Sequence, residues 1–198
     1  MSTPYSRSSM LLLAACALLM SACGTELEQQ GSSEPVSQSQ KKPLYSNQQV
    51  KIRCNSANCG TAERCLFTDP TDLLNGSPTV KLWSCQDFVG KDARFHWTAW
   101  YTPSLNAWTF QNHSTFGCLY EEPGALRLIT VPCDSLSARQ NWTQVAGSPG
   151  VSYLKNSGSG YCVHPYNNAL YPLGNVMHTF GCGYNNDVVQ DWTPEPLF

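Results

Sequence analysis

The side chains that could carry out acid–base, nucleophilic or metal chemistry are scattered along this sequence. Glu121 and Glu122 are neighbours in a predicted turn, where adjacent side chains point apart, which disfavours a catalytic carboxylate pair. Residues 157–160 lack the leading glycine of a nucleophile elbow and precede no predicted helix, so they are interpreted as a turn. His164 and His178 could share a metal ion, but no third ligand is evident. We therefore expect no enzymatic activity, no cofactor and no metal site.

Cysteine is the reactive residue that this sequence uses most, with 10 among 198 residues. Eight of them follow residue 50, an even number that favours disulfide pairing in an exported protein. Zinc is the rival interpretation of clustered cysteines, but no pair has the Cys-x-x-Cys spacing of a zinc site. The cysteines therefore indicate disulfide bonds.

The cysteines repeat in register with three tryptophans. Each repeat has a Cys followed by Leu or Val, a second Cys 15 to 20 residues later and a Trp 9 to 12 residues after that. One disulfide within each repeat is the economical pairing, and it leaves two cysteines of the first repeat to close a small loop. The predicted disulfides are Cys65–Cys85, Cys118–Cys133, Cys162–Cys182 and Cys54–Cys59. The closing tryptophans are Trp97, Trp142 and Trp192.

Short strands must position these residues. Alternating apolar and polar residues predict strands over 80–83, 126–131 and 176–180, and clusters of Pro, Gly, Asn and Ser separate the strands. Residues 52–54, 110–112 and 154–156 are predicted as the leading strand of each repeat. No window of 12 residues after the N-terminal apolar segment has a convincing helical period. The fold class is therefore predicted to be all-β.

Composition limits the partners of the chain. A formal net charge of -2 argues against nucleic acid, because a phosphate-binding surface needs a marked excess of Lys and Arg. A hydrophobic fraction of 41% is enough for a folded core. An exported, cross-linked and loop-rich domain fits these values.

The threefold set of Cys-Leu or Cys-Val, a second Cys and a closing Gln-x-Trp-like segment resembles the ricin B-type lectin domain. The segment 80–85 is especially similar to the third-strand pattern of that family. The resemblance covers residues 48–198 and implies a β-trefoil of twelve strands in three pseudo-symmetric repeats, about 48–103, 104–147 and 148–198. It also implies that Trp97, Trp142 and Trp192 are core residues rather than sugar-binding ones.

Sugar pockets of that family combine an Asp after the Cys-Leu pair, an aromatic platform two residues before the second Cys and an Asn beside the Gln-x-Trp. A carboxylate accepts hydrogen bonds from sugar hydroxyls while the apolar sugar face stacks on the ring. The three Asp positions hold Phe67, Tyr120 and His164, and the three Asn positions hold Arg94, Arg139 and Val189. The platform positions hold Trp83, Val131 and Phe180. The acidic anchor is therefore missing from all three repeats.

Two candidate pockets follow from this comparison. In the first repeat, Asp69, Asp72 and Lys81 could replace the lost anchor beside Trp83. In the third repeat, His164 and His178 accompany Phe180. The leading hypothesis is a non-catalytic module that binds a glycan or glycoconjugate, mainly through the Trp83 pocket. The alternatives are a degenerate trefoil that binds a protein, such as a toxin subunit, and a trefoil that inhibits a protease.

The N-terminal segment predicts export. Arg7 and the apolar run 10–20 are typical of a signal peptide over residues 1–22. Residues 19–23 resemble a bacterial lipobox, which implies lipidation of Cys23 and a membrane partner through that lipid anchor. Residues 23–47 are rich in Gln, Ser and Glu and are predicted to form a flexible tether. We expect an outer-membrane lipoprotein, or otherwise a secreted protein.

Overall fold

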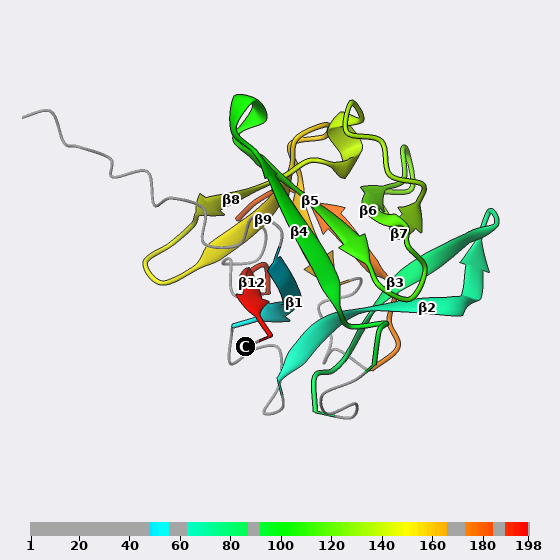
Figure 1. The fold of residues 1–198 in the computed structure, drawn as a ribbon. Coiled ribbons are helices and arrows are strands. Elements are labelled where there is room, and N and C mark those ends of the chain that lie inside the picture. The colour runs from blue at the N-terminus through cyan, green and yellow to red at the C-terminus, as the bar shows by residue number, and fades with distance from the viewer. Residues whose placement is uncertain (1–47, 56–62, 87–91, 166–172, 184–188, 198) are drawn as a thin grey trace, which may run out of the picture. The chain divides into compact units, whose positions relative to one another are not determined.

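A computed structural model describes residues 48–55, 63–86, 92–165, 173–183 and 189–197 (Figure 1). All of these residues belong to one of the two units of the chain, residues 41–198. The predicted signal peptide, the lipidation site Cys23, the tether and Cys59 lie outside the described residues. Within the described ranges, none of the helices is long and apolar enough to cross a membrane.

Twelve strands and two 3-10 helices make up the regular structure of the described residues, which confirms the all-β prediction. The strands are β1 (Gln48–Cys54), β2 (Arg64–Leu74), β3 (Ser77–Ser84), β4 (Trp97–Thr102), β5 (Ala107–Asn112), β6 (Cys118–Glu121), β7 (Leu128–Val131), β8 (Trp142–Ala146), β9 (Ser152–Asn156), β10 (Cys162–Pro165), β11 (Met177–Phe180) and β12 (Trp192–Pro196). The helices are η2 (Pro103–Leu105) and η3 (Ala138–Gln140). In β1, buried Val50 and Ile52 alternate with half-buried Lys51 and Arg53, as expected for a strand with one face in the core.

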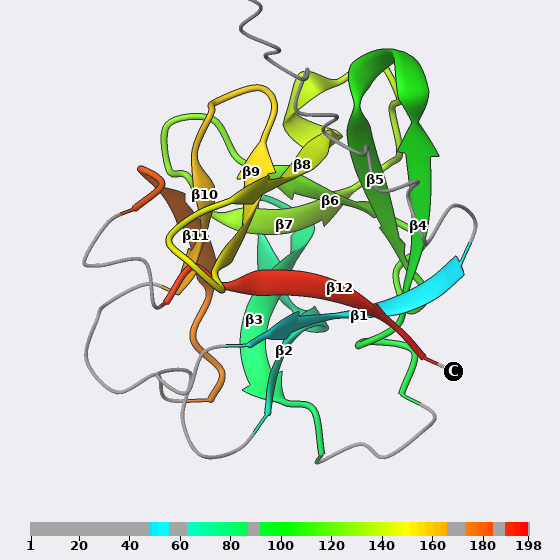
Figure 2. The same cartoon turned by 90° about the vertical axis from the view of Figure 1, so that its left-hand side faces the viewer.

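Six of the strands close on themselves. β1 pairs with β4, β4 with β5, β5 with β8, β8 with β9, and β12 with β1, each pair being antiparallel. A bridge between Tyr153 of β9 and Asp191, just before β12, completes the ring. Figure 2 shows β12 lying along β1, so the last strand of the chain pairs with the first. This closure leaves these strands without an unpaired sheet edge.

The other six strands form three hairpins, β2–β3, β6–β7 and β10–β11. One β-bridge joins each hairpin to another: Thr79 with Ile129, Arg127 with His178, and Lys81 with Val176. The hairpins therefore pack side by side, and clefts form where the tip of one hairpin meets the second strand of the next. The binding sites proposed below lie in these clefts.

The core contains the three tryptophans that close the cysteine repeats. Trp97, Trp142 and Trp192 are completely buried. Each indole Nε1 donates a hydrogen bond to a backbone carbonyl, those of Leu66, Leu119 and Val189 respectively, at 3.1 to 3.4 Å. A buried indole N–H normally requires such a partner, so each tryptophan is fixed in orientation as well as buried.

Three disulfides fasten the hairpins at their open ends. They join Cys65 to Cys85, Cys118 to Cys133 and Cys162 to Cys182, with Cα–Cα distances of 5.2, 4.9 and 5.1 Å. Each one links the start of a hairpin to the chain that follows its second strand. Three of the four predicted pairs are thus present. The fourth, Cys54–Cys59, includes a residue outside the described ranges.

Two local predictions were wrong. Glu121 is the last residue of β6 and is completely buried, not part of a turn. The reason is that its carboxylate accepts hydrogen bonds from Arg139, Ser159 and Thr179, which compensate for the loss of water. The strand predicted over 126–131 begins only at Leu128, because Leu126 has a left-handed φ of 57°.

Candidate functional site

The polar residues of the first candidate pocket form a closed ion-pair cluster on the β2–β3 hairpin. Lys81 Nζ lies 2.9 Å from Asp69 Oδ2 and 2.8 Å from Asp72 Oδ2. Burial raises the pKa of Asp69, but hydrogen bonds from Thr71 and Lys81 outweigh burial and hold that pKa well below its ordinary value. The hydrogen bond from Lys81 lowers the pKa of Asp72 in the same way. The predicted residues are therefore brought together, but they mainly neutralise one another.

The aromatic platform of the first pocket is packed against the protein itself. Trp83 is half-buried, and its ring centroid lies 5.5 Å from that of Phe67. Phe67 also contacts Phe95, and the guanidinium carbon of Arg94 lies 4.8 Å from the Phe67 ring centroid. Phe67 holds the position where the resemblance places an acidic anchor. Its side chain therefore packs on the very ring that a sugar would need.

The candidate pocket of the third repeat is more open. His164 faces His178 across β10–β11, and Cys162 faces Phe180, so all four side chains lie on one face of this hairpin. His164 is only 3% exposed, and its ring centroid lies 5.6 Å from that of Phe180. The Phe180 side chain is 43% exposed. The structure thus brings the three predicted residues of this pocket together, with an accessible ring at the edge.

A cleft of about 680 Å³ lies beside these residues. Its walls include His178, Thr179 and Phe180 of β11, and also Leu126 and Arg127, which come from the preceding β6–β7 hairpin. We name it the Phe180 cleft. Arg127 was not predicted from the sequence, because it reaches the cleft from another repeat. Its Nε donates a hydrogen bond to Glu122 Oε2 at 3.1 Å, which fixes the guanidinium at this wall.

Both imidazoles of this pocket are neutral at pH 7. Burial lowers the pKa of His178 to about 4, with a further contribution from the positive charge of Arg127. Burial also lowers the pKa of His164. A neutral imidazole carries one hydrogen-bond donor and one acceptor, as a sugar hydroxyl does. The pocket therefore combines an exposed ring with polar groups suited to uncharged hydroxylated ligands.

Metal binding has no geometric support in the described part of the chain. No three or more His, Cys, Asp or Glu side chains there are grouped so that they could hold a metal ion. His164 and His178 are neighbours, but they stand without a third potential ligand among the described residues.

Comparison with known proteins shows the fold. No protein-family model and no curated protein matches the sequence. A mosquitocidal holotoxin superposes with a TM-score of 0.60 at 17% identity, over 78% of this chain and 18% of its own. The Macrolepiota procera ricin B-like lectin in complex with lactose has a TM-score of 0.59 at 15% identity, over 77% of this chain and 98% of its own.

A third similar structure is the Polyporus squamosus lectin bound to a human-type influenza-binding epitope, with a TM-score of 0.58 at 17% identity. The match covers 78% of this chain and 50% of the lectin. The chain thus spans only half of this lectin and about a fifth of the holotoxin. Together, these likenesses show that the described residues share the β-trefoil fold of these lectins.

Proposed function

We propose that this protein is a non-catalytic carbohydrate-binding module that works through the Phe180 cleft. The observation that carries this proposal is the exposed Phe180 ring, which shares one hairpin face with His164 and His178. The apolar face of a sugar stacks on the ring, while the neutral imidazole of His178, which lines the cleft, exchanges hydrogen bonds with its hydroxyls. Similar folds in two lectins support the proposal.

The choice of the Phe180 cleft over the Trp83 pocket rests on accessibility. Phe67 packs on the first-repeat platform with Arg94 over its own ring, and Lys81 is held by two carboxylates. A sugar would have to displace these contacts before it could bind. In the third repeat, the cleft beside the platform is open.

Affinity at one such cleft is expected to be about 1 mM, which corresponds to about -4 kcal/mol. One stacked ring and a few hydrogen bonds exchanged against water supply no more than that. Several copies on one surface then give useful binding through multivalency. A lipid anchor at Cys23, preceded by a signal peptide over 1–22, would provide such a surface, and this export and anchoring are part of the proposal.

A glycan array of the oxidised protein, displayed multivalently, tests the proposal. Phe180→Ala should abolish the signal. Tyr161→Ala is a matched control, since Tyr161 is 40% exposed and lies outside the Phe180 cleft, and it should leave the signal intact. Signal lost equally in both variants would contradict the assigned site. A silent array with folded wild-type protein would contradict carbohydrate binding.

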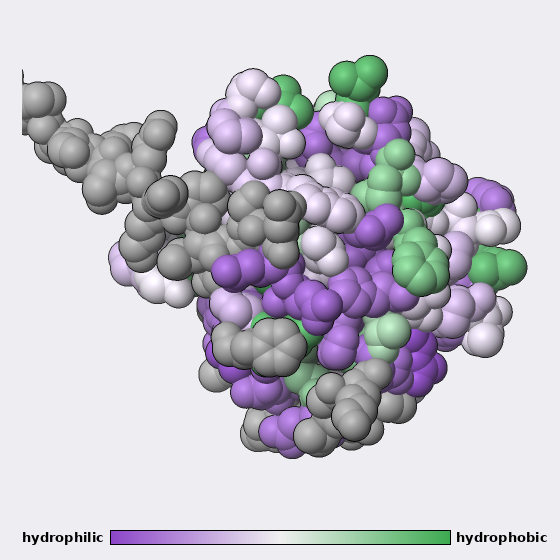
Figure 3. Space-filling view, viewed as in Figure 1, coloured by the Kyte–Doolittle hydropathy of each residue, from purple (hydrophilic) through white to green (hydrophobic). Residues whose placement is uncertain are grey.

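The second candidate function is a protein-binding subunit of a toxin. The filled pocket of the first repeat and the fold shared with a mosquitocidal holotoxin favour it. On the face shown in Figure 3, however, hydrophobic side chains stand as separate spots among hydrophilic ones rather than as one continuous patch. A contiguous exposed apolar patch would mark a site of protein interaction. Silence on the array, followed by capture of one defined partner, would favour this second function.

The three-repeat organisation is also part of the proposal. The three hairpins, the three disulfides and the three buried tryptophans recur in the same order along the chain. We infer that repeats of about 48–103, 104–147 and 148–198 share one framework and differ in their outward-facing residues.

A further inference from the structure

Phe116 combines a bulky side chain, high exposure and an unfavourable backbone. It lies in the loop between β5 and β6, and its side chain is 73% exposed. Its φ of 54° is in the left-handed region that favours glycine. In the loop between β9 and β10, the residue with the matching backbone hydrogen bond is indeed a glycine, Gly160, with φ of 77°. Neither burial nor backbone preference explains a phenylalanine at this position.

Backbone strain of this kind marks clefts in this molecule. The non-glycine residues with positive φ among the described ones are Asn75, Asn106, Phe116 and Leu126. Asparagine tolerates this conformation, so Phe116 and Leu126 are the costly cases. Leu126 lines the Phe180 cleft, and Phe116 lines a second cleft. Strained residues tend to be retained where a ligand binds.

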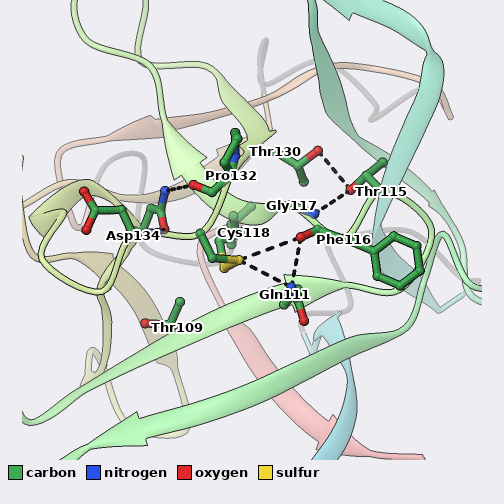
Figure 4. The surroundings of a disulfide bond; sticks show 12 residues. Thr109, Gln111, Thr115, Phe116, Gly117, Cys118, Thr130, Pro132 and Asp134 are labelled. Carbon is green, nitrogen blue, oxygen red and sulfur yellow. Dashed lines mark hydrogen bonds between the residues drawn. A yellow bond between two sulfur atoms is a disulfide. The ribbon is translucent and has the colours of Figure 1, made fainter.

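The second cleft, which we name the Phe116 cleft, has a volume of about 290 Å³. It lies between the tip of the β2–β3 hairpin, residues 76–78, the loop 115–117 and the end of β7. Figure 4 shows the Phe116 ring pointing away from the nearby disulfide, with Thr115 and Thr130 beside it. The Oγ1 atoms of these two threonines lie 3.2 Å apart in a hydrogen bond.

We propose that the Phe116 cleft is a second binding site, for one ring of an uncharged saccharide; this inference rests on the proposed carbohydrate-binding function. The described lining residues carry no charge, which fits an uncharged ligand. The hydroxyl groups of Ser77 and Thr115 can both donate and accept hydrogen bonds, and buried Thr130 holds Thr115 in place. The volume lies just below the usual range for ligand pockets, which begins at about 300 Å³, so a single ring fits better than a peptide.

This cleft differs from the pocket that the family resemblance assigns to the second repeat. Of the positions in that pocket, only Val131 lines the Phe116 cleft, while Tyr120 and Arg139 do not. The aromatic platform, Phe116, comes from the loop before β6 rather than from β7, the second strand of the hairpin. The polar wall belongs partly to the neighbouring hairpin, through Ser77.

Titration of the oxidised, isotope-labelled protein with methyl glycosides of galactose, glucose, mannose and N-acetylglucosamine tests this site by NMR. One of these probes should shift the amide signals of Ser77, Thr115 and Gly117, separately from that of Thr179 in the Phe180 cleft. Phe116→Gly should raise the dissociation constant of the probe at the Phe116 cleft by about tenfold, as expected for loss of one stacked ring. The same variant should raise the melting temperature, because glycine accepts a positive φ.

Two control variants separate the possible outcomes. Phe116→Tyr should retain binding, and Leu136→Ala, which removes a side chain that is 92% exposed, should change nothing. Shifts at Ser77 and Gly117 that survive Phe116→Gly would overturn the inference. Shifts confined to the Phe180 cleft would overturn it and leave the proposed function standing. No shift at either cleft with any probe would overturn both.

Discussion

At the scale of single residues, tryptophan has two distinct roles in this fold. Trp97, Trp142 and Trp192 are buried with hydrogen-bonded Nε1 atoms, whereas Trp83 is half-buried and its buried Nε1 has no hydrogen-bond partner in the described part of the chain. A satisfied polar atom in the core adds orientation to the burial of the ring. The three core tryptophans therefore stabilise the fold, while Trp83 packs against Phe67 on the β2–β3 hairpin.

Trp142→Ala should lower the free energy of unfolding by about 3–5 kcal/mol, as truncation of a buried aromatic side chain does. Its Nε1 bond to the Leu119 carbonyl is lost as well. Urea denaturation of the oxidised protein measures the change. Leu136→Ala, at an exposed position, should stay within about 0.5 kcal/mol of wild type. A neutral Trp142→Ala would contradict the core assignment.

At the scale of elements, buried Glu121 joins three parts of the chain. Its carboxylate at the end of β6 accepts hydrogen bonds from Arg139 in η3, from Ser159 in the loop before β10 and from Thr179 in β11. This arrangement fixes β11 against the β6–β7 hairpin, at the wall of the Phe180 cleft. Glu121 thereby positions the cleft without lining it.

Glu121→Gln should destabilise the protein by about 3 kcal/mol, because it removes one partner of a buried ion pair. The value is at the low end for such pairs, since Arg139 is partly exposed. Glu122→Gln is the matched control, because the neighbouring Glu122 pairs with a partly exposed Arg127 and should cost less than about 1 kcal/mol. Equal effects in thermal or urea unfolding would contradict the role given to Glu121.

The strands and disulfides were predictable because they depend on residues close in sequence. The spacing from Cys65 to Cys85 and on to Trp97 is set by one hairpin and its closing strand, and the same spacing recurs twice. The site was less predictable because its walls come from different repeats. Phe67 packs on Trp83, and Arg127 lines the Phe180 cleft, through contacts that no local pattern indicates.

At the scale of the whole molecule, all four histidines of the sequence respond to burial in the same direction. Burial lowers the pKa of His96, His113, His164 and His178 from the ordinary value of 6.5. Between pH 6.5 and the lowered pKa values of the folded state, the unfolded chain binds more protons than the folded one. The free energy of unfolding therefore rises with pH in this window.

The melting temperature should accordingly fall as the pH is lowered from 6.5 towards 4, the value to which the pKa of His178 is lowered. The carboxylates with lowered pKa, such as Asp69, begin to lose their contribution only below about pH 5, so the slope between pH 6.5 and about 5 reports the histidines. Calorimetry at a series of pH values measures the slope, and His178→Gln should flatten it. A melting temperature that is constant across the window would contradict this assignment.

The most direct test of carbohydrate binding is a crystal structure of the oxidised protein soaked with the saccharide that gives the strongest array signal. We predict a sugar ring stacked on Phe180, with its hydroxyl groups hydrogen-bonded to side chains of the Phe180 cleft. A sugar bound on Trp83 instead, with Phe67 displaced, would contradict the choice of site. A sugar that contacts neither the Phe180 cleft nor any other part of the three hairpins would contradict the account as a whole.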